Sequence, residues 1–328
     1  MARHCPGSDP GEGTIRQVSR PEPKQSGDGS AGQPVRDRWS RWVLKMRDDA
    51  DPDERRRAQF EQLRERVLEN GDMRPGDVVL DVGCGDGWIA FAALDRVGPG
   101  GRVVFADVSQ DLVDHCRALA EELGVLSRCE FLRASAEELP LADASVDVVT
   151  TRSVLIYLDR AGKERALREY HRVLRPGGRI SIAEPINSFA YPEPEGWLAG
   201  YDLREVAELV RKVRETLSPP GERTLIDFDE RDLLAWAELA GFDPIRLDYE
   251  ARVERGSWLG GSWERALNLA GNPLAPTLGE AIRRALTADE AKRFETHFRP
   301  LVEANAGRGR WAFSFLRGVK PEGLEAGQ

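Results

Sequence analysis

Residues 78–89 read Val78-Val79-Leu80-Asp81-Val82-Gly83-Cys84-Gly85-Asp86-Gly87-Trp88-Ile89. The first five are apolar and mostly β-branched apart from one acid, which predicts a strand buried on both faces. The glycines at every second position predict a tight turn, because glycine adopts backbone angles that a Cβ disfavours. The residues that follow predict a helix. Strand, glycine turn and helix together bring a ligand against the backbone at a helix N-terminus.

The spacing of the glycines bears on the kind of ligand that the turn accepts. Dinucleotide-binding turns have the pattern G-x-G-x-x-G. Here the pattern is G-x-G-x-G, and Trp88 stands where the third glycine of that fingerprint would be. Asp81 lies two residues before the first glycine, and its carboxylate favours a cationic or amine-bearing ligand over a phosphate. The turn therefore counts against a nicotinamide-dependent oxidoreductase, which stays as an alternative.

Strands and helices alternate after this first strand. The predicted strands are residues 78–82, 102–108, 129–134, 145–151, 179–184, 242–253 and 311–319. This order predicts an α/β fold with a doubly wound parallel sheet and right-handed crossovers. Ligands of such sheets bind at the carboxyl ends of the strands, near the first strand.

Several motifs resemble those of the class I S-adenosylmethionine-dependent methyltransferases. They are the acidic glycine turn, Asp107 at the end of the second strand, the segment 134–140 that resembles the loop meeting adenine, and the run Arg172-Val173-Leu174-Arg175-Pro176-Gly177-Gly178. The most similar group contains the ubiquinone/menaquinone-biosynthesis enzymes (methyltransferase type 11). The resemblance covers residues 74–185 closely. It implies a seven-stranded Rossmann-like sheet with strands one to five parallel, the last strand antiparallel, and helical lid insertions.

The resemblance also implies S-adenosylmethionine as cofactor and S-adenosylhomocysteine as product. The residues that would bind the cofactor are Asp81, Gly83, Cys84, Gly85, Gly87, Asp107, Val108, Ser135, Ala136 and Arg152. Asp107 would accept hydrogen bonds from both ribose hydroxyls. Asp81 would bind the amino end of the methionine part. Ser135 stands where the family often has Asp, so the adenine contact there lacks a charge.

The methyl acceptor should approach the end of the fourth strand. Arg152 is a cation in a neutral stretch; it would hold the carboxylate of the cofactor or an acidic substrate, or pair with a local acid such as Glu184. Tyr157 and Glu184 are the candidate catalytic residues, to orient the acceptor or take its proton. Well-aligned proximity supplies roughly 7–11 kcal/mol, so in-line methyl transfer needs no strong base.

The remaining segments divide the chain around this core. The predicted parts are a disordered tail (1–35), an N-terminal helical arm (36–73), the S-adenosylmethionine-binding core (74–185), a lid insertion (186–226), a core helix with strand six (227–255), a helical lid insertion (256–310) and the last core strand (311–320). Trp39 and Trp42 share one face of the arm. That face either packs on the domain or covers the cofactor pocket.

Composition limits the partners. The formal net charge of −9 argues against a nucleic-acid partner. The sequence has neither a run of 18 apolar residues nor an apolar N-terminal segment, so we expect a cytoplasmic protein without a membrane span. The four cysteines lack metal-site spacing, and no metal is expected. The predicted partner is a small-molecule or peptide acceptor, for a monomer or homodimer; a non-catalytic cofactor-binding module is a second alternative.

Overall fold

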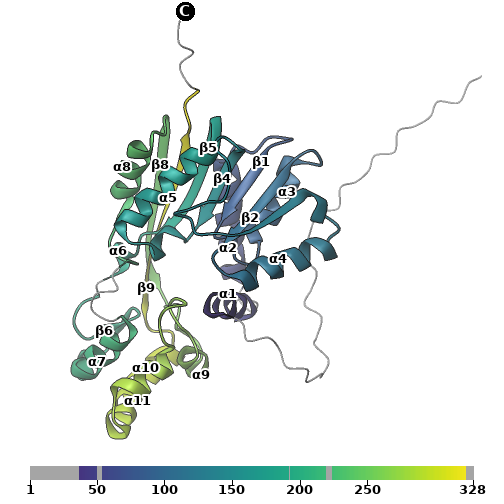
Figure 1. Ribbon diagram of the computed structural model, residues 1–328. Helices are drawn as coiled ribbons and strands as arrows, with labels where there is room; N and C mark the ends of the chain where they lie inside the picture. Colours follow the sequence, from purple (N-terminus) through teal and green to yellow (C-terminus); the bar gives the residue numbers. More distant parts are fainter. Residues whose placement is uncertain (1–36, 50–53, 192, 219–223, 323–328) are drawn as a thin grey trace, which may run out of the picture. The chain divides into compact units, whose positions relative to one another are not determined.

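The stretch 78–89 forms strand β1 (Val78–Val82), a glycine turn and helix α3 (Trp88–Val97), as predicted. The three glycines have φ angles of 68°, 56° and 80°, in the left-handed region that favours glycine. The fold comes from a computed structural model that describes residues 37–49, 54–191, 193–218 and 224–322 (Figure 1). These residues lie within one unit, Val35–Gln328. The tail predicted for residues 1–35 lies outside the described residues.

One seven-stranded sheet has the order β3-β2-β1-β4-β5-β9-β8. Its strands are β1, β2 (Arg102–Asp107), β3 (Cys129–Arg133), β4 (Val146–Arg152), β5 (Leu174–Pro185), β8 (Ile245–Arg255) and β9 (Arg308–Val319). The strands from β3 to β5 pair in parallel, whereas β9 runs antiparallel to both β5 and β8. The doubly wound, Rossmann-like sheet with an antiparallel last strand is thereby confirmed. Its order reverses between β1 and β4, where such sheets bind ligands.

Helices cover both faces of the sheet. The helices are α1 (Arg38–Asp49), α2 (Glu54–Asn70), α3, α4 (Gln110–Glu122), α5 (Arg160–Val173), α6 (Asn187–Ala190), α7 (Ala207–Leu217), α8 (Glu230–Ala240), α9 (Trp263–Leu267), α10 (Leu278–Ala285) and α11 (Ala288–Glu303). Short 3-10 turns are η1 (Leu126–Arg128), η2 (Leu155–Tyr157) and η3 (Arg204–Val206). One apolar core joins α5 and α8 to the sheet, and a second joins α2, α3 and α4 to its other face.

Strand β5 differs from the prediction at its start. The strand was predicted to begin at residue 179, but β5 already pairs with β4 at Leu174. The register then passes from Val146↔Leu174 to Val148↔Arg179, so the extra residues bulge out of the ladder. Gly177, with φ 75°, allows this bulge. The carboxyl end of β5 still reaches the same edge as that of β4.

The segments predicted as two lid insertions share one hydrophobic core. Helix α7 packs on α10 and α11, and α9 packs on the latter two. Their buried residues form a cluster separate from both sheet cores, centred on aromatic side chains such as Tyr201, Trp263, Phe294 and Phe298. We call α7, α9, α10, α11 and the hairpin β6 (Trp197–Leu198)–β7 (Tyr201–Asp202) the helical subdomain. The long strands β8 and β9 connect it to the sheet (Figure 1).

Candidate active site

The glycine turn is tied to the end of β2 through its own backbone. Gly83 and Cys84 donate their N–H groups to the carbonyl oxygen of Ala106, at 2.7 and 3.0 Å. Gly85 donates to Oδ2 of Asp107 at 3.0 Å. These N–H groups therefore face the sheet, whereas the sequence suggested that they would face a ligand. The side of the turn that faces away from the sheet carries no side chains at its glycine positions.

Two glycines of the turn have different surroundings. A Cβ built on Gly83 would lie 2.2 Å from Cγ2 of Val154, so this glycine is needed for a close approach of the chain after β4. A Cβ on Gly85 would meet only Cγ1 of Val43, at 3.7 Å. The face of Gly85 is thus bounded by helix α1, which carries Val43. This is the surface that a ligand of the turn would contact.

Asp107 lies at the carboxyl end of β2 and is 7% exposed. Its Oδ2 accepts from the N–H of Gly85, and its Oδ1 accepts from the N–H of Ser109 at 2.9 Å. Burial raises the pKa of this carboxyl and nearby Asp37 adds to the rise, whereas the backbone N–H groups of Ser109, Gly85 and Val108 lower it. A carboxylate has about four lone-pair positions, so the oxygens that accept from Gly85 and Ser109 keep capacity for a further donor. Val108, 47% exposed, offers an apolar surface next to it.

Asp81 is enclosed by protein. It is 2% exposed, and the hydroxyl of Thr150 donates to its Oδ1 at 2.7 Å. Burial raises its pKa to about 7, while the Thr150 hydroxyl and the N–H of Ala90 lower it and nearby Asp107 raises it. The bond from Ala90 ties the carboxyl to the first turn of α3. Sequence reasoning missed Thr150, although the β1–β4 register sets it beside Asp81.

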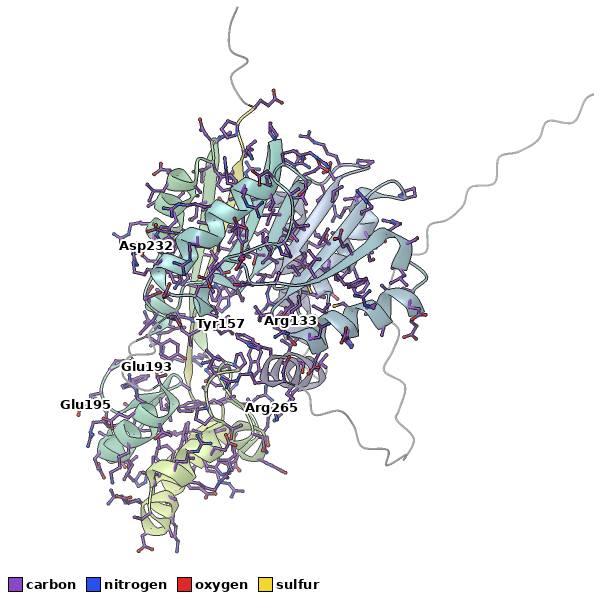
Figure 2. The ribbon with its side chains drawn as sticks, in the orientation of Figure 1. Arg133, Tyr157, Glu193, Glu195, Asp232 and Arg265 are labelled. Atoms are coloured by element: carbon purple, nitrogen blue, oxygen red, sulfur yellow. The ribbon has the colours of Figure 1, made fainter. Side chains whose placement is uncertain are left out.

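The loop after β3 lies against the end of β2. The N–H of Ala134 donates to the carbonyl of Asp107 at 3.0 Å. The Ser135 hydroxyl accepts from the N–H of Glu137 at 3.2 Å, which stabilises a local turn. Ala136 is 4% exposed and packs in the core. Figure 2 labels Arg133 at the last position of β3, whose Nε donates to the carbonyl of Val108 at 3.4 Å. The predicted residues 107, 108, 135 and 136 are therefore neighbours.

Arg152, the last residue of β4, lies among aromatic rings. Its guanidinium carbon is 5.5 Å from the ring centre of Phe60 on α2 and 5.4 Å from that of Trp88 on α3. The two rings meet edge to face at 5.9 Å. A guanidinium at this distance from an aromatic face is attracted by it. The contacts hold the cation at the end of β4, beside the start of α3.

Tyr157 and Glu184 have different partners in the structure. Tyr157, labelled in Figure 2, ends η2. Its ring meets that of Trp39 of α1 edge to face, with ring centres 4.8 Å apart. Burial raises the pKa of Tyr157 well above the usual value, and the nearby Glu184 adds to the rise. Glu184 of β5 is fully buried and accepts hydrogen bonds from backbone N–H groups of the segment 154–156. Burial raises the pKa of Glu184 to about 7, and those backbone donors lower it.

Helix α1 spans from the glycine turn to the helical subdomain. At its start, Asp37 accepts a hydrogen bond from the Ser109 hydroxyl at 2.6 Å, next to Asp107. On the subdomain side, Trp42 Nε1 donates to the carbonyl of Ala270 at 3.2 Å. Lys45 Nζ donates to the carbonyl of Asn268 at 2.8 Å. The Asp37 anchor was missed from sequence, although an acid before Trp39 and Ser40 is typical of a helix N-cap.

These residues fit an adenosyl cofactor. Asp107 has acceptor capacity for a hydroxyl donor, Val108 gives an apolar surface for a planar base, and Gly85 places no side chain between the turn and α1. Among the described residues, no group of three or more His, Cys, Asp or Glu could hold a metal ion. In the same part of the chain, no helix is long and apolar enough to cross a membrane.

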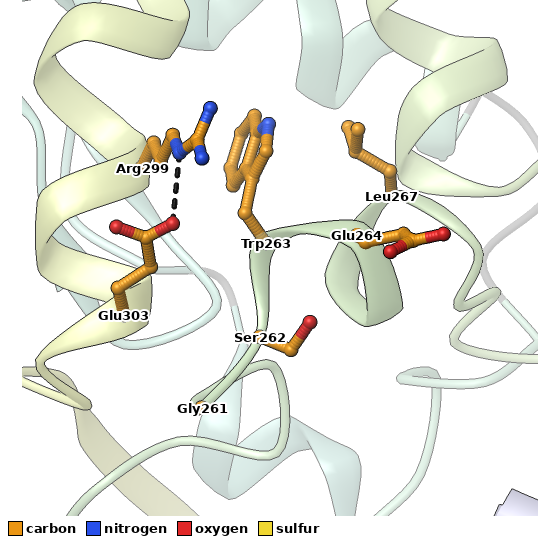
Figure 3. A pocket seen from close by; sticks show the side chains of 7 residues that line it. All are labelled: Gly261, Ser262, Trp263, Glu264, Leu267, Arg299 and Glu303. Atoms are coloured by element: carbon orange, nitrogen blue, oxygen red, sulfur yellow. Dashed lines mark hydrogen bonds and ion pairs between the residues drawn. The ribbon is translucent and has the colours of Figure 1, made fainter.

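A hollow of about 580 Å³ lies elsewhere, in the helical subdomain (Figure 3). Its lining comes from the segment 261–267 and from α11, where Arg299 Nε is 2.8 Å from Glu303 Oε1. None of the predicted site residues lines it. We therefore place the candidate active site at the carboxyl ends of β1, β2 and β4, under α1, and assign no role in the reaction to this hollow.

Comparisons with known proteins identify the family of this chain. A family profile described as "Methyltransferase domain" matches residues 79–178. The ubiquinone/menaquinone biosynthesis C-methyltransferase UbiE of Klebsiella pneumoniae (strain 342) is 32% identical over 185 residues, which cover 55% of this chain and 71% of that protein. An uncharacterized 37.1 kDa protein in transposon TN4556 of Streptomyces fradiae is 40% identical over 119 residues, 36% of this chain and 33% of that protein.

The fold has solved counterparts. The YcgJ protein of Bacillus subtilis superposes with a TM-score of 0.50 at 19% identity, covering 80% of this chain and all of that one. Together with the sequence matches, the seven-stranded sheet and the acidic glycine turn lead to one assignment. The chain is an enzyme that belongs to the class I S-adenosylmethionine-dependent methyltransferases.

Proposed function

We propose that this enzyme binds S-adenosylmethionine at the glycine turn and transfers its methyl group to a small-molecule or peptide acceptor at the carboxyl end of β4. The observation that carries the proposal is the geometry of Asp107. Its buried carboxylate accepts from the N–H groups of Gly85 and Ser109, and it lies at the carboxyl end of β2 with capacity for a further donor. Such a carboxylate selects a vicinal diol, as in a ribose, because both hydroxyls find a charge-assisted partner.

The other predicted cofactor residues have distinct parts in this proposal. Val108 and the turn at Ser135 and Ala136 would bind the adenine, Gly83, Cys84, Gly85 and Gly87 shape the surface under the methionine part, and Arg152 would hold its carboxylate. Asp81 acts mainly by fixing the first turn of α3, since its carboxyl is buried against Thr150. When bound, the cofactor supplies a sulfonium methyl group as electrophile. The chain's task is to position the acceptor and exclude water.

The acceptor would meet an aromatic surface. Trp39 and Tyr157 contact each other where α1 passes the end of β4, and aromatic rings suit an apolar or planar acceptor. Helix α1 would close the site, because Val43 lies over the face of Gly85 and Trp42 bonds to the subdomain loop at Ala270. The relative UbiE is named a C-methyltransferase. For this enzyme, the proposal includes carbon, oxygen, nitrogen and sulfur as the atom of the substrate that receives the methyl group. We place the domain boundaries as the sequence predicts them, with the two insertions acting as one lid.

The proposal is tested by replacing Asp107. Asp107→Ala should weaken S-adenosylhomocysteine binding by about 1–3 kcal/mol, or roughly 5- to 150-fold, because the ribose hydroxyls lose their acceptor. Asp107→Asn should lose less, since an amide oxygen still accepts. The matched control is Asp114→Ala, which replaces an exposed acid of α4 whose carboxylate accepts from Gln110 in the same helix. Isothermal calorimetry measures each affinity; wild-type affinity in both Asp107 variants contradicts the proposal.

A further inference from the structure

The loop between β4 and α5, residues 153–159, contacts two parts of the candidate site. Ser153 opens it with a φ of 55°. The next residue, Val154, packs so closely on Gly83 that the glycine cannot carry a Cβ. Further along, Tyr157 meets Trp39 of α1. The conformation of this loop therefore decides both the shape of the glycine turn and the position of α1 over it.

One carboxylate holds the first half of the loop. Oε1 of Glu184 accepts from the N–H of Val154 at 2.8 Å and of Leu155 at 3.0 Å. Oε2 accepts from the N–H of Ile156 at 3.4 Å. A carboxylate bound to successive N–H groups stabilises a helical turn as an N-cap does, although here it comes from a neighbouring strand. Glu184 is fully buried, so these charge-assisted bonds are shielded from water.

A buried lysine holds the second half. Lys163 of α5 is fully buried, and its Nζ donates to the carbonyl of Leu158 at 2.5 Å. The same Nζ donates to the carbonyl of Thr224 at 3.1 Å and lies 2.6 Å from Oδ1 of Asp227. The loop is thus fixed at both ends by charged groups that solvent does not reach. A loop that is held in this way keeps the residues that it carries in fixed positions.

From these contacts we infer that Glu184 is a positioning residue for methyl transfer, which sets Val154 against Gly83 and Tyr157 against α1. The inference rests on the proposed function. It assigns Glu184 a role different from acid–base catalysis, because its carboxylate is buried and engaged by the loop backbone. Removing the carboxylate should loosen the loop and thereby weaken cofactor binding, although Glu184 itself would not touch the cofactor.

The test compares Glu184 with a matched carboxylate. Glu193 also accepts two backbone N–H groups, from Ala199 at 2.8 Å and Gly200 at 2.5 Å, within the loop before β7. Full-length Glu184→Ala, Glu184→Gln, Glu193→Ala and Glu193→Gln are compared with the wild type. Calorimetry gives the affinity for S-adenosylhomocysteine, and hydrogen exchange gives the protection of the amides in residues 153–158.

We expect faster exchange in residues 153–158 of Glu184→Ala and an affinity loss of about tenfold or more. The exchange rate and the affinity of Glu184→Gln should fall between those of Glu184→Ala and the wild type, because the amide oxygen of glutamine still accepts from two N–H groups. If Glu184→Ala does not fold, Glu184→Gln serves as the test. Both Glu193 variants should bind as the wild type does. Val154→Ala should lose affinity while the loop amides stay protected, because only the contact with Gly83 is removed.

Two results overturn the inference without touching the proposed function. One is wild-type affinity in Glu184→Ala and Glu184→Gln, and the other is unchanged exchange of the loop amides. Absence of S-adenosylhomocysteine binding by the wild type is a different result: it overturns the proposed function and the inference with it.

Discussion

At the scale of single residues, the site depends on three buried carboxyl groups with different partners. Asp81 accepts from a hydroxyl and from the N–H of Ala90, Asp107 from the N–H groups of Gly85 and Ser109, and Glu184 from three backbone N–H groups. Among these three acids, only Asp107 lies beside an exposed apolar residue, Val108. Burying a carboxyl without such partners costs several kcal/mol. The partners therefore explain how the fold accommodates the three buried acids, and the exposed surface beside Asp107 is why that acid is assigned to the ligand.

Replacing Gly83 by alanine tests the close approach of Val154 to the glycine turn. Gly83→Ala should lower the free energy of unfolding by about 2–5 kcal/mol, because the new Cβ meets Val154 and the left-handed φ disfavours alanine. The control is Gly124→Ala, at a φ of 70° with nothing within 4 Å of the added Cβ, which should lose only about 1 kcal/mol. Urea denaturation measures both. Equal losses would show that the Val154 contact does not matter.

At the scale of elements, helix α1 is the piece that joins the two halves of the site. Asp37 just before it bonds to the start of α4 beside Asp107, and Trp39 near its start meets Tyr157. Val43 in its middle lies over Gly85, and Trp42 and Lys45 reach the subdomain loop.

The core strands were predictable, because each buried strand needs an apolar run. The partners of α1 are not predictable in this way, since the hydrogen-bond partners of Ser40 and Trp42 lie 71 and 228 positions away in the chain.

Removing the anchor of α1 at Asp37 should make this helix easier for a protease to cleave. Asp37→Ala removes the acceptor of the Ser109 hydroxyl and of the Ser40 N–H, so we expect a loss of about 1 kcal/mol in the local stability of α1. Trypsin, which cleaves after Arg41 and Lys45, should then cut α1 faster, and S-adenosylhomocysteine should protect it less than in the wild type. Asp114→Ala is the control. Unchanged cleavage in Asp37→Ala would contradict the proposed anchoring.

At the scale of the whole molecule, segments far apart in sequence build the subdomain. The sequence predicted two lid insertions, 186–226 and 256–310, but not their packing on each other, because periodicity shows which face of a helix is apolar and not what covers that face. The sheet order, the glycine turn and the neighbourhood of Asp107 were predictable, since strand ends converge by topology. The sequence does not show which acid binds the ligand and which one accepts hydrogen bonds from the backbone, because this depends on distances between strands.

Stability should depend on pH through Asp81. Its pKa is about 7 in the folded protein against an ordinary 3.8, with burial the main cause and Asp107 and Asp86 adding repulsion. Between about pH 4 and 7 the folded state therefore keeps a proton that the unfolded state has lost. As pH rises through this window, the wild type should lose up to about 1.4 kcal/mol per pH unit relative to Asp81→Asn, which cannot ionise.

Urea denaturation of both proteins at pH 5, 6 and 7 measures this difference, with Asp114→Asn as the exposed control. Above about pH 7 the difference should level off, because both states are then ionised. Parallel pH dependences of the wild type and Asp81→Asn would mean that Asp81 is not protonated in the folded protein.

The central claim is that the glycine turn and Asp107 bind an adenosyl cofactor. It is tested most directly by calorimetric titration of the wild-type protein with S-adenosylhomocysteine, beside an identical titration with NADH. The account predicts saturable one-to-one binding of S-adenosylhomocysteine and none of NADH. Binding of NADH alone, or of neither ligand, would contradict it.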